Sequence, residues 1–375
     1  MKLFDVYPLF NVTPVSAKGI QVTDDKGQKY LDFYGGHAVI SIGHSHPHYV
    51  NRLENQLNAI GFYSNSIQNP LQKELAKKLG ILSNCEDYNL FLCNSGAEAN
   101  ENALKMASFH TGKSKVIAFR NGFHGRTSAA VATTDNSKIN APINQQQKVT
   151  FLSFEDFEGL ESALETNEYC AVILEAIQGV GGLDEPTTEF YQFIAENCKK
   201  HNALLIADEV QSGFGRTGKF FGFQHHDIHP DIITIAKGMG NGFPVGGVLI
   251  HESIKASHGL LGTTFGGNHL ACVATLAVLE VIEKERLIEN VNSLEKYFIN
   301  KTKENQQIKK IKGRGLMLGL EFDFEVADLR KNLIYKQHIF TGGSLNKKLL
   351  RFLPALNITK EHITIFFDAL KAELS

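Results

Sequence analysis

Residues 205–211 read LIADEVQ and residues 235–242 read IAKGMGNG, so two apolar runs end at the charged side chains Asp208 and Lys237. Neither run alternates with polar residues, which is typical of strands that helices cover on both faces of a parallel sheet. The carboxyl ends of parallel strands meet at the edge where α/β domains bind ligands. We therefore expect the Asp208 carboxylate and the Lys237 amine to lie at one such edge.

The same pattern of a short apolar run, a glycine or asparagine turn and a helical segment repeats through the middle of the chain. The clearest helical segment is 98–110, in which several small or apolar residues and His110 share one face. This alternation predicts an α/β domain whose sheet has about seven strands, with helices on both sides. The predicted strands are residues 90–93, 116–119, 149–152, 171–174, 204–207, 232–235 and 248–250.

The two ends of the chain predict a second, smaller unit. Residues 19–33 indicate a hairpin, a long helix is predicted to start near Asn268, and residues 311–322 indicate a turn and a strand. The expected division is an N-terminal segment that joins the small domain (1–60), a large α/β domain (61–270) and a C-terminal small α+β domain (271–375).

Composition and charge exclude several classes of protein. Apolar residues make up 43% of the 375 residues, charged residues 21%, and the formal net charge is -2. These values indicate neither a disordered chain nor a surface for polyanions, so we expect no nucleic-acid partner. No apolar run approaches the roughly 20 residues that cross a bilayer, and the start of the chain lacks the pattern of an export signal. The expected location is the cytoplasm, without a membrane partner.

The cysteines and histidines do not form a metal-binding pattern. The 5 cysteines are scattered without a C-x-x-C pair, which favours reduced thiols over a disulfide frame or a zinc site. The histidines within residues 44–48 and 225–229 are interpreted as parts of surface turns, because no pattern of cysteine or carboxylate accompanies them. We therefore expect no metal.

The pair of Lys237 and Asp208 allows two interpretations. A lysine that is partly desolvated and set among glycines can lose its proton and attack a carbonyl as a neutral amine. A structural salt bridge between the two strand ends explains the same residues equally well.

Two further segments add to this pair. Residues 94–100 (NSGAEAN) join a strand to a helix, so the amide groups around Ser95 form an anion cradle unless Ser95 is an ordinary N-cap. Residues 122–127 (GFHGRT) follow the next strand, where Phe123 could lie against a planar ring and Arg126 could hold a carboxylate. Each segment taken alone is also compatible with a simple turn.

Together these segments resemble the class III, or ω-amino, pyridoxal-phosphate-dependent aminotransferases, most closely the members that act on acylated ornithine. The resemblance covers nearly the whole chain, and several stretches in the right order are more specific than one motif. The matching stretches are residues 43–47, 94–100, 123–127, 175–182, 208–218, 236–247, 263–268 and 351–354.

The resemblance implies a fold and a reaction. The fold is fold-type I, in which a large domain with a mainly parallel seven-stranded sheet is joined by a small α+β domain from both chain ends. The reaction moves the δ-amino group of N-acetylornithine or N-succinylornithine to 2-oxoglutarate, in arginine biosynthesis. The alternative within the family is ornithine δ-aminotransferase or another ω-amino acid aminotransferase.

The resemblance also implies the site residues and the cofactor, pyridoxal 5'-phosphate. Lys237 would bind the cofactor aldehyde and move a proton, Asp208 would pair with the ring nitrogen, and Glu175 would lie near both cofactor and substrate. Thr264 would reach the phosphate from the neighbouring subunit, so a homodimer with shared active sites is expected. The other implied cofactor contacts are Ser95, Gly96, Ala97, Phe123, His124 and Gln211, and the implied substrate contacts are Arg126, Arg351 and His37.

Two positions depart from the family pattern. Val180 stands where members commonly have a glutamate that shields the second substrate arginine, and His37 replaces an aliphatic residue or a tyrosine. A rival class is the P-loop nucleotide triphosphatases, because residues 213–219 fit the first seven positions of that motif, but Phe220 stands where the motif needs serine or threonine. No G-x-G-x-x-G follows a predicted strand, which disfavours a dinucleotide-binding enzyme.

Overall fold

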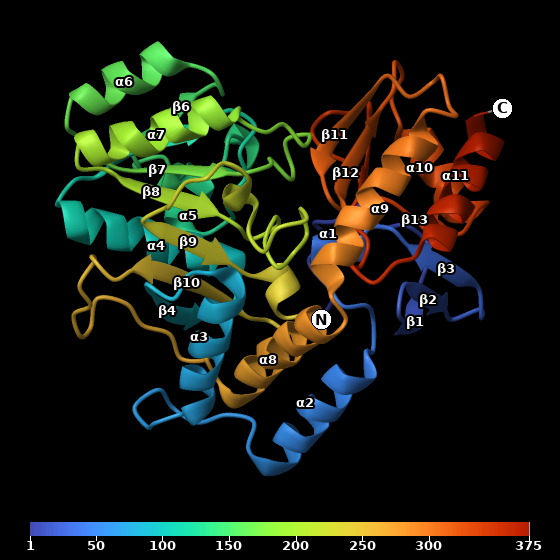
Figure 1. The fold of residues 1–375 in the computed structure, drawn as a ribbon, viewed down its shortest axis with the longest axis horizontal. Coiled ribbons are helices and arrows are strands. Elements are labelled where there is room, and N and C mark those ends of the chain that lie inside the picture. The colour runs from blue at the N-terminus through green and yellow to red at the C-terminus, as the bar shows by residue number, and fades with distance from the viewer. Residues whose placement is uncertain (375) are drawn as a thin grey trace.

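The computed structural model describes residues 1–374, and its largest feature is a seven-stranded sheet, on the left of Figure 1. Every neighbouring pair of strands is parallel except those of β10, which runs antiparallel to both β4 and β9. The connection 236–245 between β9 and β10 is too short for the crossover that a parallel pair requires. The spatial order is β4 (Tyr88–Cys93), β10 (Gly246–His251), β9 (Ile232–Ile235), β8 (Leu204–Asp208), β7 (Tyr169–Glu175), β5 (Lys115–Phe119) and β6 (Val149–Leu152).

Helices cover both faces of this sheet, which is why its strands are apolar without alternation. Ala171 belongs to the same apolar cluster as Ala103 of α4, whereas its neighbour Val172 belongs to the cluster of Phe190 in α7. The predicted mainly parallel sheet of an α/β domain is thus confirmed. The helices of this part are α3 (Pro70–Ser83), α4 (Gly96–Thr111), α5 (Ser128–Ala132), α6 (Phe157–Glu165) and α7 (Thr188–Lys200).

Helix α4 differs in detail from the predicted segment 98–110. It begins at Gly96, because the Ser95 hydroxyl caps it by accepting a hydrogen bond from the Glu98 amide at 3.2 Å. Of the residues predicted to share one face, His110 is exposed, because it lies in the last turn of the helix. A hydrated imidazole is tolerated there, where the helix dipole favours positive charge.

Two smaller sheets lie on the right of Figure 1 and combine both ends of the chain. In the first, β13 from the C-terminal part pairs in parallel with β3 from the N-terminal part. In the second, residues 311–322, predicted as a turn and one strand, form the antiparallel pair of β11 and β12, because Gly315 adopts a positive φ of 60° in the turn between them. The strands are β1 (Pro14–Lys18), β2 (Gln21–Asp24), β3 (Lys29–Asp32) and β13 (Ile339–Phe340), then β11 (Lys310–Arg314), β12 (Met317–Glu321) and β14 (Leu349–Phe352).

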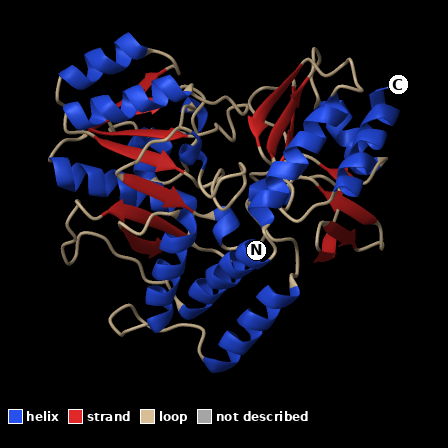
Figure 2. Cartoon of the chain, in the orientation of Figure 1, coloured by secondary structure: helices blue, strands red, loops and turns tan. Residues whose placement is uncertain are grey.

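Helices cover the small sheets and connect them to the large one, as Figure 2 shows. Helix α8 is buried along most of its length and contacts α2, α3 and α9. No helix of residues 1–374 is long and apolar enough to span a membrane. The remaining helices are α1 (Gly35–Ala38), α2 (Pro47–Ala59), α8 (His269–Lys284), α9 (Leu287–Thr302), α10 (Ala327–Tyr335) and α11 (Lys360–Leu374).

Candidate active site

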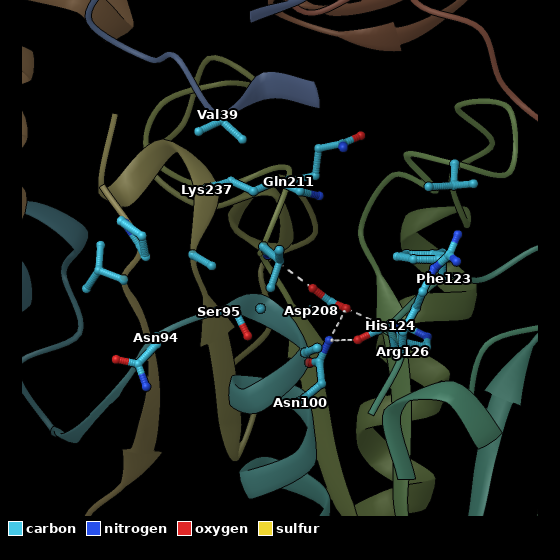
Figure 3. Close-up of a pocket in the computed structure, with 18 of the residues that line it drawn as sticks. Val39, Asn94, Ser95, Asn100, Phe123, His124, Arg126, Asp208, Gln211 and Lys237 are labelled. Atoms are coloured by element: carbon cyan, nitrogen blue, oxygen red, sulfur yellow. Dashed lines mark hydrogen bonds and ion pairs between the residues drawn. The ribbon is translucent and has the colours of Figure 1, made fainter. Parts of the chain in front are cut away.

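A cavity of about 430 Å³ lies where the parallel strands β4, β5, β7, β8 and β9 end (Figure 3). This is the sheet edge that the strand pattern predicts as a binding site. The structure brings most of the predicted site residues together there, from segments as far apart in the sequence as Ser95 and Lys237. Those that line the cavity are Ser95, Gly96, Ala97, Phe123, His124, Arg126, Glu175, Asp208, Gln211 and Lys237.

Lys237 faces this cavity directly after β9. Its φ of 46° lies in the left-handed region, which residues other than glycine rarely adopt and which is often found at functional sites. Desolvation lowers the pKa of its amine, although the carboxylates of Asp208 and Glu175 act in the opposite direction. An amine with a lowered pKa reaches its neutral, nucleophilic form more easily.

Asp208 ends β8 and is held by three hydrogen bonds. Its Oδ2 atom accepts from Nδ2 of Asn100 at 2.8 Å and from Nδ1 of His124 at 2.7 Å, as the dashed lines of Figure 3 show. Its Oδ1 atom accepts only from the amide of Val210, at 3.1 Å. Burial opposes a charge on His124, but the hydrogen bond and charge of Asp208 outweigh it and raise the pKa of the imidazole. Asp208 is therefore a buried carboxylate whose orientation is fixed.

Asn100 is a site residue that the sequence analysis missed. It lies on α4, is 1% exposed, and donates to both Asp208 and the carbonyl of His124, the latter at 2.7 Å. Its own side-chain oxygen accepts from Thr234 of β9 at 2.7 Å. The sequence did contain a signal for this residue. A polar side chain among the small residues of a helix face that packs on a sheet needs a buried hydrogen-bond partner. Asn100 joins the helix, the aspartate and the strand that leads to Lys237.

Glu175 ends β7 and holds two neighbouring loops. Its carboxylate accepts from the amides of Phe123 at 2.9 Å and Gly179 at 2.8 Å. Burial, together with the charge of Asp208, raises the pKa of Glu175, although His124 partly offsets this. The carboxylate thus orients the loop that carries Phe123 in the cavity wall.

The N-terminus of α4 lies at the cavity. Ser95 caps the helix, as the N-cap interpretation predicts, and anion binding at this turn stays a prediction. Gly96 leaves no room for a side chain, because a Cβ atom there would lie 2.6 Å from Cγ1 of Val210. The unpaired backbone amides of this first turn therefore face the cavity at close range.

Three predicted residues do not line the cavity. Arg351 is buried against it and donates to the carbonyl of Gly179, to Oε1 of Gln211 at 3.4 Å and to the Tyr34 hydroxyl at 3.4 Å. His37 is exposed, and its carbonyl accepts from Gln211 at 3.3 Å. Thr264 is exposed between β10 and α8.

The rival motifs have other roles in the fold. In the segment that resembles a P-loop, the fully buried Arg216 donates to the carbonyls of Leu316 at 3.2 Å and Pro354. Through these bonds, the segment holds the C-terminal part of the chain against the large sheet domain. It is followed by a short 3₁₀ turn. The histidines of residues 44–48 do not converge, because each pairs with a different carboxylate.

Comparisons with known proteins identify the family of the chain. The class-III aminotransferase family model matches residues 6–374. The acetylornithine aminotransferase of Bacillus subtilis is 38% identical, covering 100% of this chain and 97% of that protein. The acetylornithine aminotransferase of Methanocaldococcus jannaschii is 40% identical, covering 97% of this chain and 94% of that protein.

Solved structures show the same architecture. The ornithine aminotransferase of Toxoplasma gondii, described with partial occupancy of PLP at its active site, aligns with a TM-score of 0.89 at 28% identity, covering 97% of this chain and 90% of that one. An S-selective transaminase from Arthrobacter sp. has the same fold, with a TM-score of 0.90 at 23% identity, covering 100% of this chain and 95% of that one. The chain therefore belongs to the class-III aminotransferases and is a pyridoxal-phosphate-dependent enzyme.

Proposed function

We propose that this enzyme transfers the δ-amino group of an N-acylornithine, acetylated or succinylated, to 2-oxoglutarate, giving the N-acylglutamate semialdehyde and glutamate. The observation that carries the proposal is the near full-length similarity to relatives named acetylornithine aminotransferase. Such a reaction belongs in arginine biosynthesis, and we propose the cytoplasm as its location. Ornithine δ-aminotransferase is the second candidate, because solved ornithine aminotransferases share the fold.

The residues of the cavity fit the cofactor. The first turn of α4, with Ser95, Gly96 and Ala97, offers backbone amides to a phosphate. Oδ1 of Asp208 retains acceptor capacity for a protonated ring nitrogen, because His124 and Asn100 both bond to Oδ2. We propose that Phe123 covers one ring face and that Gln211 lies near the ring hydroxyl. When bound, the cofactor supplies an electron-withdrawing ring that stabilises negative charge on the reacting carbon.

The chain's own residues then hold and move protons. The Lys237 amine, whose pKa burial lowers, is the group that we propose removes and returns the proton at the substrate carbon. The buried His124 and Asn100 hold the Asp208 carboxylate in one orientation throughout the reaction. Glu175 fixes the loops that carry Phe123 and Gly179, which shapes the wall that excludes water.

Two arginines are proposed to orient the substrates. The reacting amine of an acylornithine is its δ-amine, so the exposed Arg126 in the cavity wall is placed to hold the distant α-carboxylate. Glutamate must instead present its α-carbon, which brings a carboxylate toward Arg351. No carboxylate of residues 1–374 forms an ion pair with Arg351, and Val180 lines the cavity next to the Gly179 carbonyl that Arg351 contacts.

Val180→Glu is expected to slow the glutamate half-reaction roughly tenfold relative to the acylornithine half-reaction. A carboxylate at this position would pair with Arg351, and the glutamate carboxylate would then have to displace it, whereas an acylornithine would not. The measurement is the ratio of the two single-turnover rates. Val180→Gln, of similar size but neutral, is the control and should leave the ratio near its original value. An unchanged ratio in Val180→Glu would show that Arg351 is not the site of the glutamate carboxylate.

A homodimer with shared sites is expected, because Thr264 is exposed and does not line the cavity of its own chain. Neither Thr264→Ala nor Lys237→Ala alone should be fully active. In a mixed dimer, the Thr264→Ala chain supplies Lys237 and the Lys237→Ala chain supplies Thr264, so up to one site per dimer should be intact. Thr264→Ser keeps the hydroxyl and serves as the control. Mixed dimers without recovered activity, or an active monomer by light scattering at assay concentration, would rule out the shared site.

The substrate proposal is tested by steady-state rates with ornithine, N-acetylornithine and N-succinylornithine, each with 2-oxoglutarate. At least one acylated donor should show a kcat/KM roughly tenfold or more above that of free ornithine, because the free α-amine adds a positive charge beside the cationic arginines. 4-Aminobutyrate, which lacks the α-carboxylate and acyl group, is the comparison donor. A preference for free ornithine would favour the second candidate.

We also propose the division of the chain into residues 1–60, 61–270 and 271–375. Its support is that the seven-stranded sheet lies within residues 88–251, whereas strands from residues 14–32 and 339–340 share one small sheet.

A further inference from the structure

Arg330, on α10, is a cation that no acid neutralises within residues 1–374. Its Nε atom donates to the Thr341 carbonyl at 2.8 Å, and no other side-chain hydrogen bond of its guanidinium is present. The guanidinium carbon lies 5.1 Å from the ring centre of Phe10 and 5.8 Å from that of Tyr34. Arg330 lines a second cavity, of about 660 Å³, so an anion could approach its free guanidinium nitrogens.

Tyr34 lines the second cavity and contacts Arg351, which is buried beside the first. Arg351 also lies 5.8 Å from the Tyr34 ring centre and donates to the Tyr34 hydroxyl, so two guanidiniums share one aromatic ring. The ring position depends on Gly342, because a Cβ atom there would lie 2.4 Å from Cε2 of Tyr34. Val39 lines both cavities, so the two cavities are adjacent.

Nearby groups do not compensate the positive charge of the two arginines. The one carboxylate that lines the second cavity, Asp32, is already occupied: it accepts from the amides of Tyr34 and Gly35 and pairs with His44 at 2.9 Å. His37, hydrogen-bonded to the Tyr34 hydroxyl, offers no negative charge. Although His37 is exposed by surface area, partial desolvation of its ring and then the neighbouring cation Arg351 lower its pKa to about 4, so the ring is neutral at neutral pH.

Two of the substrates considered above, glutamate and N-acetylornithine, leave Arg330 unpaired. In the proposed function, Arg126 and Arg351 together account for the two carboxylates of glutamate, and an N-acetylornithine brings only one. A half-buried arginine beside a second arginine is destabilised by desolvation and by repulsion between like charges. A ligand that brings a further carboxylate would relieve both.

We propose that Arg330 and Tyr34 form an anionic subsite that receives the terminal carboxylate of a dicarboxylic acyl group on the α-nitrogen of the donor. This inference rests on the proposed function, because it requires an N-acylornithine donor. It predicts that the enzyme prefers N-succinylornithine, whose acyl group ends in a carboxylate, to N-acetylornithine, whose acyl group is neutral.

The test compares kcat/KM for N-succinylornithine and N-acetylornithine in the holoenzyme and in Arg330→Gln. The native enzyme should favour the succinylated donor, and Arg330→Gln should lower the ratio at least tenfold, mainly through the KM for N-succinylornithine. The rate with N-acetylornithine should change less than about twofold, which shows that the variant is folded. Arg330→Lys keeps the charge and should retain part of the preference.

Lys331→Gln is the matched control, because Lys331 is the adjacent residue of α10, is exposed, and pairs only with Asp328 at 3.6 Å. It should leave the ratio unchanged. A ratio that Arg330→Gln does not alter, or a native enzyme that favours the acetylated donor, would overturn the subsite while the proposed function stands. A native enzyme that uses neither acylated donor would instead overturn the proposed function, and the subsite with it.

Discussion

Lys237→Ala is expected to abolish the visible absorption of the bound cofactor and to reduce turnover by roughly 10⁴-fold or more. Lys237 is the amine at the carboxyl end of β9, it faces the cavity, and burial lowers the pKa of its amine. The substitution removes the amine that we propose binds the cofactor aldehyde and moves the proton. The measurements are the absorption spectrum of the purified protein and the steady-state rate.

Two variants separate this role from a general loss of structure. Lys237→Arg keeps a positive charge near Asp208 and Glu175, but a guanidinium stays protonated and cannot act as a nucleophile, so it should also lack the band. Lys113→Ala removes a lysine that holds the carbonyls of His201 and Asn202 and does not line the cavity. The Lys113→Ala variant should be less stable but should retain the visible absorption band of the bound cofactor. A visible band that persists in Lys237→Ala would show that another group binds the cofactor.

The large sheet and the position of the ligand edge were predictable, because both depend on local patterns. Apolar runs without alternation identify strands buried on two faces, and the residue after each run falls at the sheet edge. Asp208 and Lys237 could therefore be placed from the sequence, whereas the antiparallel direction of β10 follows from the length of one connection and was not predicted.

Other features of the site depend on contacts between distant segments. The Tyr34 hydroxyl meets Arg351, and the Ser41 amide meets Asn241, although nothing in the local sequence of either pair indicates it. Asn100 looks like one polar residue on a helix until the fold brings it to Asp208. Hydrogen-bond partners of this kind are determined by the packing of whole elements, so periodicity and spacing cannot supply them.

Asp208→Asn is expected to retain most of the bound cofactor and to lose roughly 10²- to 10³-fold in rate. In the native structure, Oδ2 of Asp208 accepts from His124 and Asn100, so the amide oxygen of an asparagine would turn toward these two donors. Its NH₂ group would then face the cavity and meet Val210 as a donor, in place of the native acceptor. Such a group can bind an unprotonated ring nitrogen but cannot stabilise a protonated one.

The loss should therefore fall on catalysis rather than on binding, because the ring charge matters most when negative charge develops on the substrate carbon. Cofactor content from absorption, set against kcat, measures the two effects separately. Asp231→Asn, which removes a carboxylate that holds the Leu205 amide at the opposite end of β8, should lower stability and leave kcat nearly unchanged. If Asp208→Asn loses the cofactor and keeps its rate once saturated with it, Asp208 anchors the cofactor without activating the ring. If instead kcat falls with the cofactor still bound, the charge of this carboxylate, fixed by His124 and Asn100, is what the chemistry requires.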